Sequence, residues 1–423
     1  MLLYMLIGYM FLYIHRPFEV WPVLGTVRIE LVYMLLITIV WLASPKVVNV
    51  NRLTLVIAAF AATMLLGWIT SDYADAGTVT LTNWLKLLPF YLMVITSIKD
   101  ERDFKRIMTG FMVVMFIYLS HSLREFYNGR HVYRMGIARM VGVDVMHADP
   151  NSFAATVVYV LPMIFPFWAT RQNRKQTFAV LAYVALSIAC VLLTGSRTGM
   201  IGLCMFGLMC ILASRRRAIM LLALFLVASI GWLSLPEDLQ NRYLTIVDDD
   251  RGPKNAQASK DSRYLLLLRA VEIWQDSPLM GYGPGSFPQA SGAGIQAHSL
   301  YGQALAELGI MGALTLFGFV VCISLNYWEA CHLRRILPPD DRSKNFEFQV
   351  VFSVFLTMIL LLLLGFGGHN FYRYTWIWYA AFQGISLNLL RKQVEKVERQ
   401  TEPEWEPVAR PRPDARFRPR TAP

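Results

Sequence analysis

The feature that most constrains this chain is a series of apolar runs long enough to cross a lipid bilayer. About twelve such runs alternate with short polar segments, and 55% of the 423 residues are hydrophobic while only 16% are charged. A bilayer core of roughly 30 Å needs about 20 mostly apolar residues in a helix. We therefore predict an all-α membrane protein with about 12 transmembrane helices.

The predicted spans are short at the first, second and eighth positions, and their ends are approximate. The first run has no basic segment before it and is followed by His15, Arg16 and Pro17 instead of a small-residue cleavage site, so we expect a retained membrane helix. The twelve runs cover residues 1–14, 29–43, 53–69, 81–98, 107–123, 152–169, 178–194, 199–213, 219–235, 304–327, 348–366 and 375–390.

The positions of lysine and arginine orient these spans. With a cytoplasmic N-terminus, each short connection on the cytoplasmic side carries Lys or Arg, as the positive-inside rule requires. The opposite, periplasmic side then receives two long segments, 124–151 and 236–303, the second of which lies between the ninth and tenth helices. We predict a multi-pass inner-membrane protein with both termini in the cytoplasm.

Two further properties follow from the charge pattern. The net charge of +11 comes from short basic clusters between apolar runs, which indicates membrane topology and not nucleic-acid binding. Residues 391–423 are rich in Pro and Arg and nearly free of aliphatic side chains. We therefore predict a polytopic membrane domain over 1–390 and a disordered cytoplasmic tail over 391–423.

One arginine on the periplasmic side lies in a very short turn. Arg197 belongs to the sequence T-G-S-R-T-G at residues 194–199, which joins two apolar runs. An arginine held at the membrane surface binds an anion, pairs with an acid or extends to a lipid phosphate. The turn by itself leaves anion binding and lipid contact open.

A second arginine begins a predicted helix within the 236–303 loop. Residues 261–274 have helical periodicity, with Asp261 or Ser262 as a possible N-cap and Pro278 downstream. We expect one face to carry Tyr264, Leu267, Leu268, Val271 and Trp274. Arg263 borders this face and Arg269 lies opposite, so Arg263 is the better candidate for a site, although an exposed or ion-paired helix start is the alternative.

Further polar residues lie where the periplasmic segments enter spans. His298 and Tyr301 share a face before the tenth span, and an unperturbed histidine pKa near 6.5 suits a general base, although an interfacial histidine is the alternative. Asp149 and Asn151 precede the sixth span, where an N-cap is the simpler role. Residues 369–373 (H-N-F-Y-R) either line the same cavity or form an interfacial belt.

An acidic run in the loop raises the question of a metal ion. Asp248, Asp249 and Asp250 precede Arg251, Gly252 and Pro253, a context that favours a solvated turn. We therefore predict no metal site.

The order and spacing of these segments resemble the bacterial O-antigen ligase and O-antigen polymerase superfamily of polytopic membrane glycosyltransferases. The short segment D-P-N at 149–151 is similar to members found near exosortase systems, as is Y-I-H-R-P at 13–17. The main resemblance is carried by T-G-S-R-T-G at 194–199, the helix from Ser262 to Trp274, S-P-L-M-G-Y-G at 277–283, H-S-L-Y at 298–301 and E-L-G-I-M-G at 307–312.

The resemblance implies a reaction. A glycan would pass from an undecaprenyl diphosphate carrier to an acceptor hydroxyl on lipid A-core or another glycan at the periplasmic face, with inversion and without metal or cofactor. Arg197 and Arg263 would bind the diphosphate, and His298 would act as the base. Glu307 would have a supporting role, and the remaining substrate-binding candidates are Tyr301, Asp149 and Asn151.

Other functions remain open at this level. A polymerase that extends a lipid-linked chain and a protein O-glycosyltransferase belong to the same superfamily. A transporter of lipid-linked oligosaccharide is a different class, but transporters concentrate polar residues at mid-membrane and often contain repeats, and the predicted spans are poor in polar residues.

Overall fold

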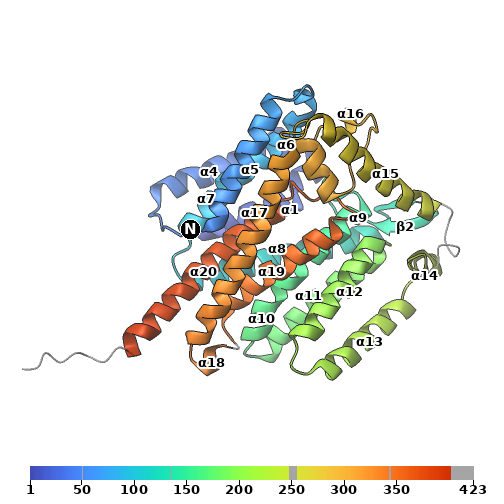
Figure 1. Cartoon of the computed structure of the whole chain (residues 1–423). Helices are drawn as coiled ribbons and strands as arrows, with labels where there is room; N and C mark the ends of the chain where they lie inside the picture. Colours follow the sequence, from blue (N-terminus) through green and yellow to red (C-terminus); the bar gives the residue numbers. More distant parts are fainter. Residues whose placement is uncertain (50, 135, 247–254, 343, 402–423) are drawn as a thin grey trace, which may run out of the picture.

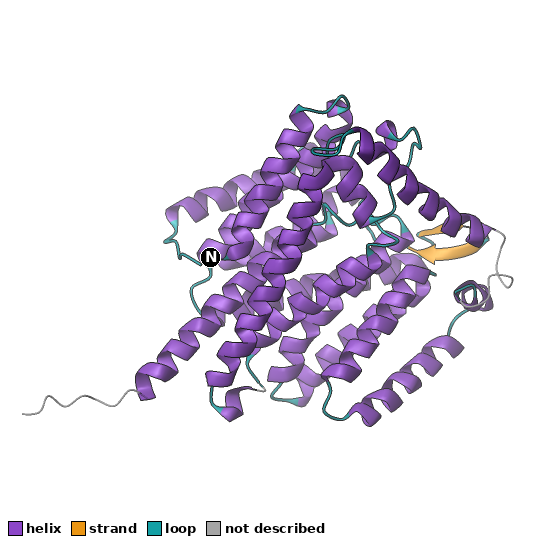
Figure 2. Ribbon diagram, viewed as in Figure 1, coloured by secondary structure: helices purple, strands orange, loops and turns teal. Residues whose placement is uncertain are grey.

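The computed structural model describes the chain except for residues 50, 135, 247–254, 343 and 402–423, and it is a helical bundle with one small β-hairpin (Figures 1 and 2). The elements in chain order are α1 (Leu2–His15), α2 (Pro17–Val20), α3 (Pro22–Thr26), α4 (Ile29–Ala43), α5 (Arg52–Ile69), α6 (Ala74–Leu85), α7 (Leu87–Ser97), α8 (Glu101–Tyr127), β1 (His131–Arg134), β2 (Ile137–Met140), α9 (Pro150–Val160), η1 (Leu161–Met163), α10 (Ile164–Thr170), α11 (Arg174–Leu193), α12 (Arg197–Ala213), α13 (Arg217–Leu233), α14 (Glu237–Leu244), α15 (Asn255–Asp276), α16 (Phe287–Ala290), α17 (Leu300–Ile336), α18 (Pro339–Arg342), α19 (Phe346–Leu364) and α20 (Tyr374–Thr401).

Membrane-spanning helices dominate the described part of the chain. Seven helical segments there are long and apolar enough to cross a membrane, counting Ala74–Ser97 and Pro150–Thr170 as single segments. Four shorter apolar helices accompany them: α1, α4, α12 and α13. The all-α membrane architecture is therefore confirmed, while the count of about twelve spans stays a prediction.

Several helices extend beyond their apolar runs. Helix α8 begins at Glu101, where the Asp100 carboxylate accepts from the Asp103 amide at 2.8 Å, and it continues to Tyr127. Helix α20 continues to Thr401, and Val394 is buried in it. This helix thus extends past residue 390, because polar helical turns continue where the apolar run stops. The division into a membrane domain and a tail stays a prediction. The later tail residues, 402–423, lie outside the described residues.

The segment predicted only as an external connection contains a β-hairpin. Strands β1 and β2 pair antiparallel, with His131 opposite Met140 and Arg134 opposite Ile137. Gly136 in the connecting turn has a φ of 78°, which glycine adopts without steric cost. Figure 1 shows the hairpin beside α9 and α14, at the same side of the bundle as the start of α15; we call this region the site end.

Helix α17 is broken at Gly309, and a loop fills the break. The backbone there has φ 60° and ψ −151°, outside the helical region. The carbonyls of Ala306 and Glu307 accept from the amides of Tyr282 and Gly283 at 3.0 and 2.8 Å. In return, the amides of Ile310 and Met311 donate to Pro278 and Leu279 at 2.8 and 3.2 Å. The 278–283 segment thus supplies the hydrogen bonds that the broken helix lacks.

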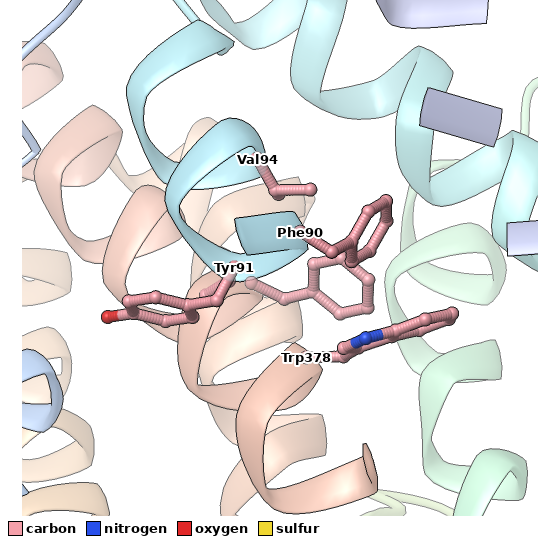
Figure 3. A pocket seen from close by; sticks show the side chains of 6 residues that line it. Phe90, Tyr91, Val94 and Trp378 are labelled. Carbon is pink, nitrogen blue, oxygen red and sulfur yellow. The ribbon is translucent and has the colours of Figure 1, made fainter. Parts of the chain in front are cut away.

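The core of the bundle lies around α20, which packs against α19, α17, α7 and α5. A narrow apolar pocket lies between α7 and α20 (Figure 3), where Trp378 contacts Phe90 with ring centroids 4.8 Å apart. Its lining contains no charged residue, so it is not a candidate site for a charged substrate. The lining residues are Phe90, Tyr91, Val94, Trp378, Ala381 and Phe382.

Candidate functional site

Arg197 is the first residue of α12 and lies at the site end. The Ser196 hydroxyl caps this helix by accepting from the Gly199 amide at 3.2 Å, which fixes where α12 begins. One terminal nitrogen of Arg197 donates to the Thr245 hydroxyl at 3.4 Å. The T-G-S-R-T-G turn is therefore the start of a capped helix that presents its arginine towards the end of α14.

Arg263 reaches the same turn from α15. Its Nη1 donates to the hydroxyl of Thr198 at 3.4 Å. A Cβ built on Gly367 would lie 2.9 Å from this nitrogen, so the absence of a side chain at Gly367 leaves room for the guanidinium. Burial lowers the pKa of Arg263, and the positive charge of Arg197 lowers it further. Two arginines from separate segments thus lie at one turn, since Arg197 belongs to it and Arg263 contacts Thr198.

The packed face of α15 differs from the predicted one. Leu266, Ala270 and Ile273 are buried, whereas Tyr264 and Leu268 are exposed. The difference arises because α15 packs on the beginning of α17, where a Cβ built on Gly302 would lie 3.0 Å from the Ala270 Cβ. Close packing against a small residue selects the face with Ala270, and Arg263 lies on that face, two turns earlier.

The helix containing Arg263 also differs in its start, since α15 begins at Asn255 and not at 261 or 262. Arg269 pairs with Glu272 at 2.7 Å at the surface, as expected for the arginine that does not enter the site. Arg263 and Arg269 therefore form a natural pair for comparison, one directed to the bundle and one to the surface.

His298 is held in an unusual conformation directly before α17. Its φ is 48°, in the left-handed region that residues other than glycine rarely adopt, and such positions concentrate at functional sites. The next residue, Ser299, caps α17 by accepting from the Gly302 amide at 3.4 Å. The half-buried ring meets the ring of His369 edge-on, with centroids 5.3 Å apart.

The environment of His298 favours its neutral form. Burial lowers the pKa of its imidazole, and the nearby positive charge of Arg263 lowers it further. The carboxylate of Asp149 acts in the opposite direction without reversing the shift. A histidine that stays neutral at pH 7 has a nitrogen lone pair available to accept a proton.

Asp149 and Asn151 flank the same region and have distinct structural partners. Asp149 caps α9 by accepting from the amides of Asn151 and Ser152 at 3.0 and 2.9 Å, and it lies 3.9 Å from Arg134. The side-chain oxygen of Asn151 accepts from Arg139 at 3.1 Å and from the Ser196 hydroxyl at 2.8 Å. Asn151 thus ties the start of α9 to the turn before Arg197.

Tyr301 and Glu307 have their polar groups engaged within the bundle. The Tyr301 hydroxyl donates to the carbonyl of Leu362 at 3.0 Å. The wholly buried Glu307 accepts from the Gly285 amide at 2.8 Å and from the Tyr372 hydroxyl at 2.7 Å. Glu307 therefore connects the loop after α15 with the loop that carries His369, and these contacts suit a supporting role. The substrate-binding role of Tyr301 stays a prediction.

Three arginines of this region were not among the predicted site residues. Arg242 of α14 donates through Nε to the Gly195 carbonyl at 2.6 Å, and Arg139 of β2 donates through Nε to the Thr194 carbonyl at 2.6 Å. Arg134 lies beside Asp149. The apolar neighbours of Arg139 in the sequence were a signal that it is buried, but the contact of Arg242 with the turn follows only from the tertiary structure.

Residues 369–373, whose role the sequence left open, differ in how close they come to the candidate site. Arg373 donates to the hydroxyls of Ser152 and Thr156 and lies over the Tyr159 ring, 5.8 Å from its centroid. It therefore ties this connection to α9. His369 is the residue of the connection that reaches His298.

A second polar cluster lies where α1, α8 and the 141–148 connection meet. Asp144 is fully buried and accepts from the Tyr118 hydroxyl at 2.6 Å and from His147 Nδ1 at 2.8 Å. Nearby, the rings of His15 and His121 stack with nitrogens 2.9 Å apart. This cluster fixes the connection that leads into Asp149.

Among the described residues, no group of three or more His, Cys, Asp or Glu side chains is arranged to hold a metal ion. Asp248, Asp249 and Asp250 lie outside the described residues.

Guanidinium groups, a neutral histidine and few acids make an end of the bundle suited to binding an anion next to a proton acceptor. Residues 181–317 match the family described as O-antigen ligase. The match covers less than half of the chain and confirms the resemblance to the O-antigen ligase and polymerase superfamily. It includes Arg197, Arg242, Arg263 and His298, whereas Asp149 and His369 lie outside it. No curated protein matches the chain.

Proposed function

We propose that this O-antigen ligase-like chain transfers a glycan from undecaprenyl diphosphate to a hydroxyl of lipid A-core. The reaction would take place at the periplasmic face of the bacterial inner membrane, with both termini cytoplasmic and about twelve spans. The observation that carries the proposal is the contact of Arg263 with the turn that contains Arg197, close enough to His298 for the Arg263 charge to favour its neutral form.

In the proposed reaction, the arginines bind the diphosphate and His298 accepts the proton of the acceptor hydroxyl. The acceptor oxygen forms a bond to the anomeric carbon on the face opposite the diphosphate, so configuration inverts. The bond from that carbon to the phosphate oxygen breaks, and its electron pair stays on the diphosphate. The fixed guanidinium groups stabilise this developing charge, and the scheme assigns no role to a metal ion or cofactor.

The break in α17 bears on the alternative that the chain is a transporter. Transporters often use broken helices whose free backbone groups coordinate the transported substrate. Here the groups at Gly309 pair with residues 278–283, so they are occupied within the protein. This pairing favours a rigid support for the site over a transport path.

The test is glycan transfer by the purified full-length protein in lipid nanodiscs, with lipid-linked donor and lipid A-core acceptor. We expect product without nucleotide or ion gradient. His298→Ala and Arg263→Ala should each reduce the rate at least about a hundredfold, because they remove a general base and a fixed countercharge respectively. Arg269→Ala, which removes a surface arginine of the same helix, should keep most of the activity.

The outcomes separate the candidate functions. Near wild-type transfer by either site variant, at normal expression, would contradict the assigned roles. Product formed only on a second lipid-linked repeat unit would identify a polymerase, and product formed only on a protein would identify a protein O-glycosyltransferase. Movement of the donor across the bilayer without any product would identify a transporter.

A further inference from the structure

Helix α14 is seated on the T-G-S-R-T-G turn by a close contact that requires glycine. Gly195 has a φ of 58°, and a Cβ there would lie 2.8 Å from Leu239 Cδ2 and 3.1 Å from Arg242 Cδ. Leu239 and Tyr243 are buried on the same face of α14, and the Tyr243 hydroxyl donates to the Leu192 carbonyl at 2.9 Å. Gly195 thus allows the stem of Arg242 to lie directly on the turn before Arg197.

The contact with this turn holds the Arg242 guanidinium through its Nε only. Its Nε donates to the Gly195 carbonyl at 2.6 Å, while its two terminal nitrogens make no hydrogen bond to the described part of the chain. Burial lowers the pKa of Arg242, and the positive charge of Arg197 lowers it further. Since two terminal nitrogens form a fork that matches phosphate oxygens, the free edge of Arg242 is suited to an anion.

Arg139 lies beneath this turn and adds fixed positive charge. Its side chain is fully buried, its Nε and one terminal nitrogen donate to Thr194 and Asn151, and the other terminal nitrogen has no partner among the described residues. Burial and the charge of Arg242 lower the pKa of Arg139 to about 9, so it remains protonated at neutral pH. A buried cation this close to Arg242 is costly unless an anion is bound nearby.

Three of the guanidinium groups are ordered in space. Arg242 donates to the carbonyl of Gly195 on one side of Arg197 in the turn, and Arg263 donates to the hydroxyl of Thr198 on the other. Thr245 accepts from Arg197 at 3.4 Å and donates to the Arg242 carbonyl at 2.7 Å, which places Arg197 beside the end of α14. Arg263, at Thr198, lies on the other side. We call Arg263, Arg197 and Arg242 the arginine row.

We propose that Arg242 is a third phosphate-binding residue of this site and that the arginine row makes the site select a diphosphate ester over a monophosphate ester. The inference rests on the proposed function, because it assigns a binding residue to the diphosphate of the same carrier lipid. Two phosphoryl groups extend along a row of three guanidiniums, whereas one phosphoryl group engages only part of it. When the glycosyl bond breaks, the diphosphate gains one negative charge, which a third guanidinium also stabilises.

Binding of two soluble probes to the full-length detergent-solubilised protein tests this proposal. The probes are farnesyl diphosphate and farnesyl monophosphate, whose apolar tails are identical. We expect Arg242→Gln to weaken the diphosphate about tenfold to a hundredfold, the usual range for a charged hydrogen-bonding group, and the monophosphate about threefold or less. Arg269→Gln, which removes an arginine that pairs with Glu272 at the surface, should leave both affinities unchanged.

Two further variants keep the test decisive if Arg242→Gln unfolds the loop. Arg242→Lys keeps the charge and the stem but loses the fork, so an intermediate and still diphosphate-selective loss is expected. Gly195→Ala keeps the guanidinium but displaces it, and it should reproduce the loss seen with Arg242→Gln.

Each alternative result has a distinct meaning. Equal weakening of both probes, or unchanged diphosphate binding in the two Arg242 variants, would overturn the inference. A wild-type protein that binds both probes equally would also overturn it, while glycan transfer remained intact. Selective diphosphate binding without any glycan transfer would instead count against the proposed function.

Discussion

Replacing Gly309 by alanine should destabilise the protein by about 2–6 kcal/mol. The backbone at Gly309, with φ 60° and ψ −151°, lies in a region that is essentially limited to glycine, and strain of this kind costs about 1–3 kcal/mol. A Cβ would also lie 2.5 Å from the carbonyl carbon and oxygen of Leu279. Moving Leu279 away weakens the two hydrogen bonds that Pro278 and Leu279 accept, which are worth about 1–3 kcal/mol together.

The assay is thermal unfolding of the purified protein in detergent. With an unfolding entropy of about 2.1 cal/mol/K per residue, the expected loss lowers the midpoint by roughly 2–7 °C. Gly318→Ala is the matched control on the same helix, because its Cβ would lie at 3.3 Å from a Val56 methyl group and its backbone is helical. That control should change the midpoint by about 1 °C or less, since alanine also favours helix.

The comparison of the two alanine variants decides the question. Equal midpoints for Gly309→Ala and Gly318→Ala would refute the reasoning, since it requires that residues 278–283 complete the broken helix. A lowered midpoint with normal binding of farnesyl diphosphate would place the defect in the support and not in the arginine row.

Three more outcomes are expected. Transfer should fall as the pH drops through the pKa of His298, which lies below its usual 6.5. Arg263→Gln should move this fall to higher pH in the residual activity, since loss of the positive charge favours protonation of His298. An unmoved pH profile would count against the electrostatic coupling of Arg263 and His298. Burial by itself would raise the pKa of Asp144, but His147 and Tyr118 hold it at about 2. The ionised carboxylate therefore stabilises the fold by about 2 kcal/mol above pH 4, and this stabilisation disappears as the pH falls towards 2. Asp144→Asn should remove most of the pH dependence of unfolding in that range, and an unchanged profile would contradict this. EDTA should leave transfer nearly unchanged, and a strong loss would point to residues 248–250.

The sequence predicts helices well where apolar residues run together, and it predicts their ends poorly. Helix α8 starts at Glu101 and α20 ends at Thr401 because polar turns continue a helix without adding to the apolar signal. The hairpin of β1 and β2 was not predicted, since its short strands lack a strong alternating pattern. The chosen face of α15 was wrong because close packing at Ala270 and Gly302 depends on small size, which a hydrophobic pattern does not measure.

Part of the candidate site was accessible from sequence because its residues have local signatures. Arg197 lies in a short turn, Arg263 starts a helix, and His298 precedes a span, and the structure brings the first two to Thr198 and Thr245. Arg242 has no such signature. Its position depends on a backbone carbonyl 47 residues earlier in the chain, a relation that only the folded structure contains.

The contacts of Arg139 impose an order on how this protein is assembled in the membrane. A chain is synthesised from its N-terminus, so Arg139 is made 55 residues before Thr194, whose carbonyl accepts from the Arg139 Nε. Until α11 and α12 have been inserted, the Arg139 guanidinium must stay hydrated. Only then can the hairpin dock, and Arg242, which lies 47 residues after Gly195, reaches that carbonyl later still. The charged end of the bundle is therefore completed late, after the helices beneath it are in place.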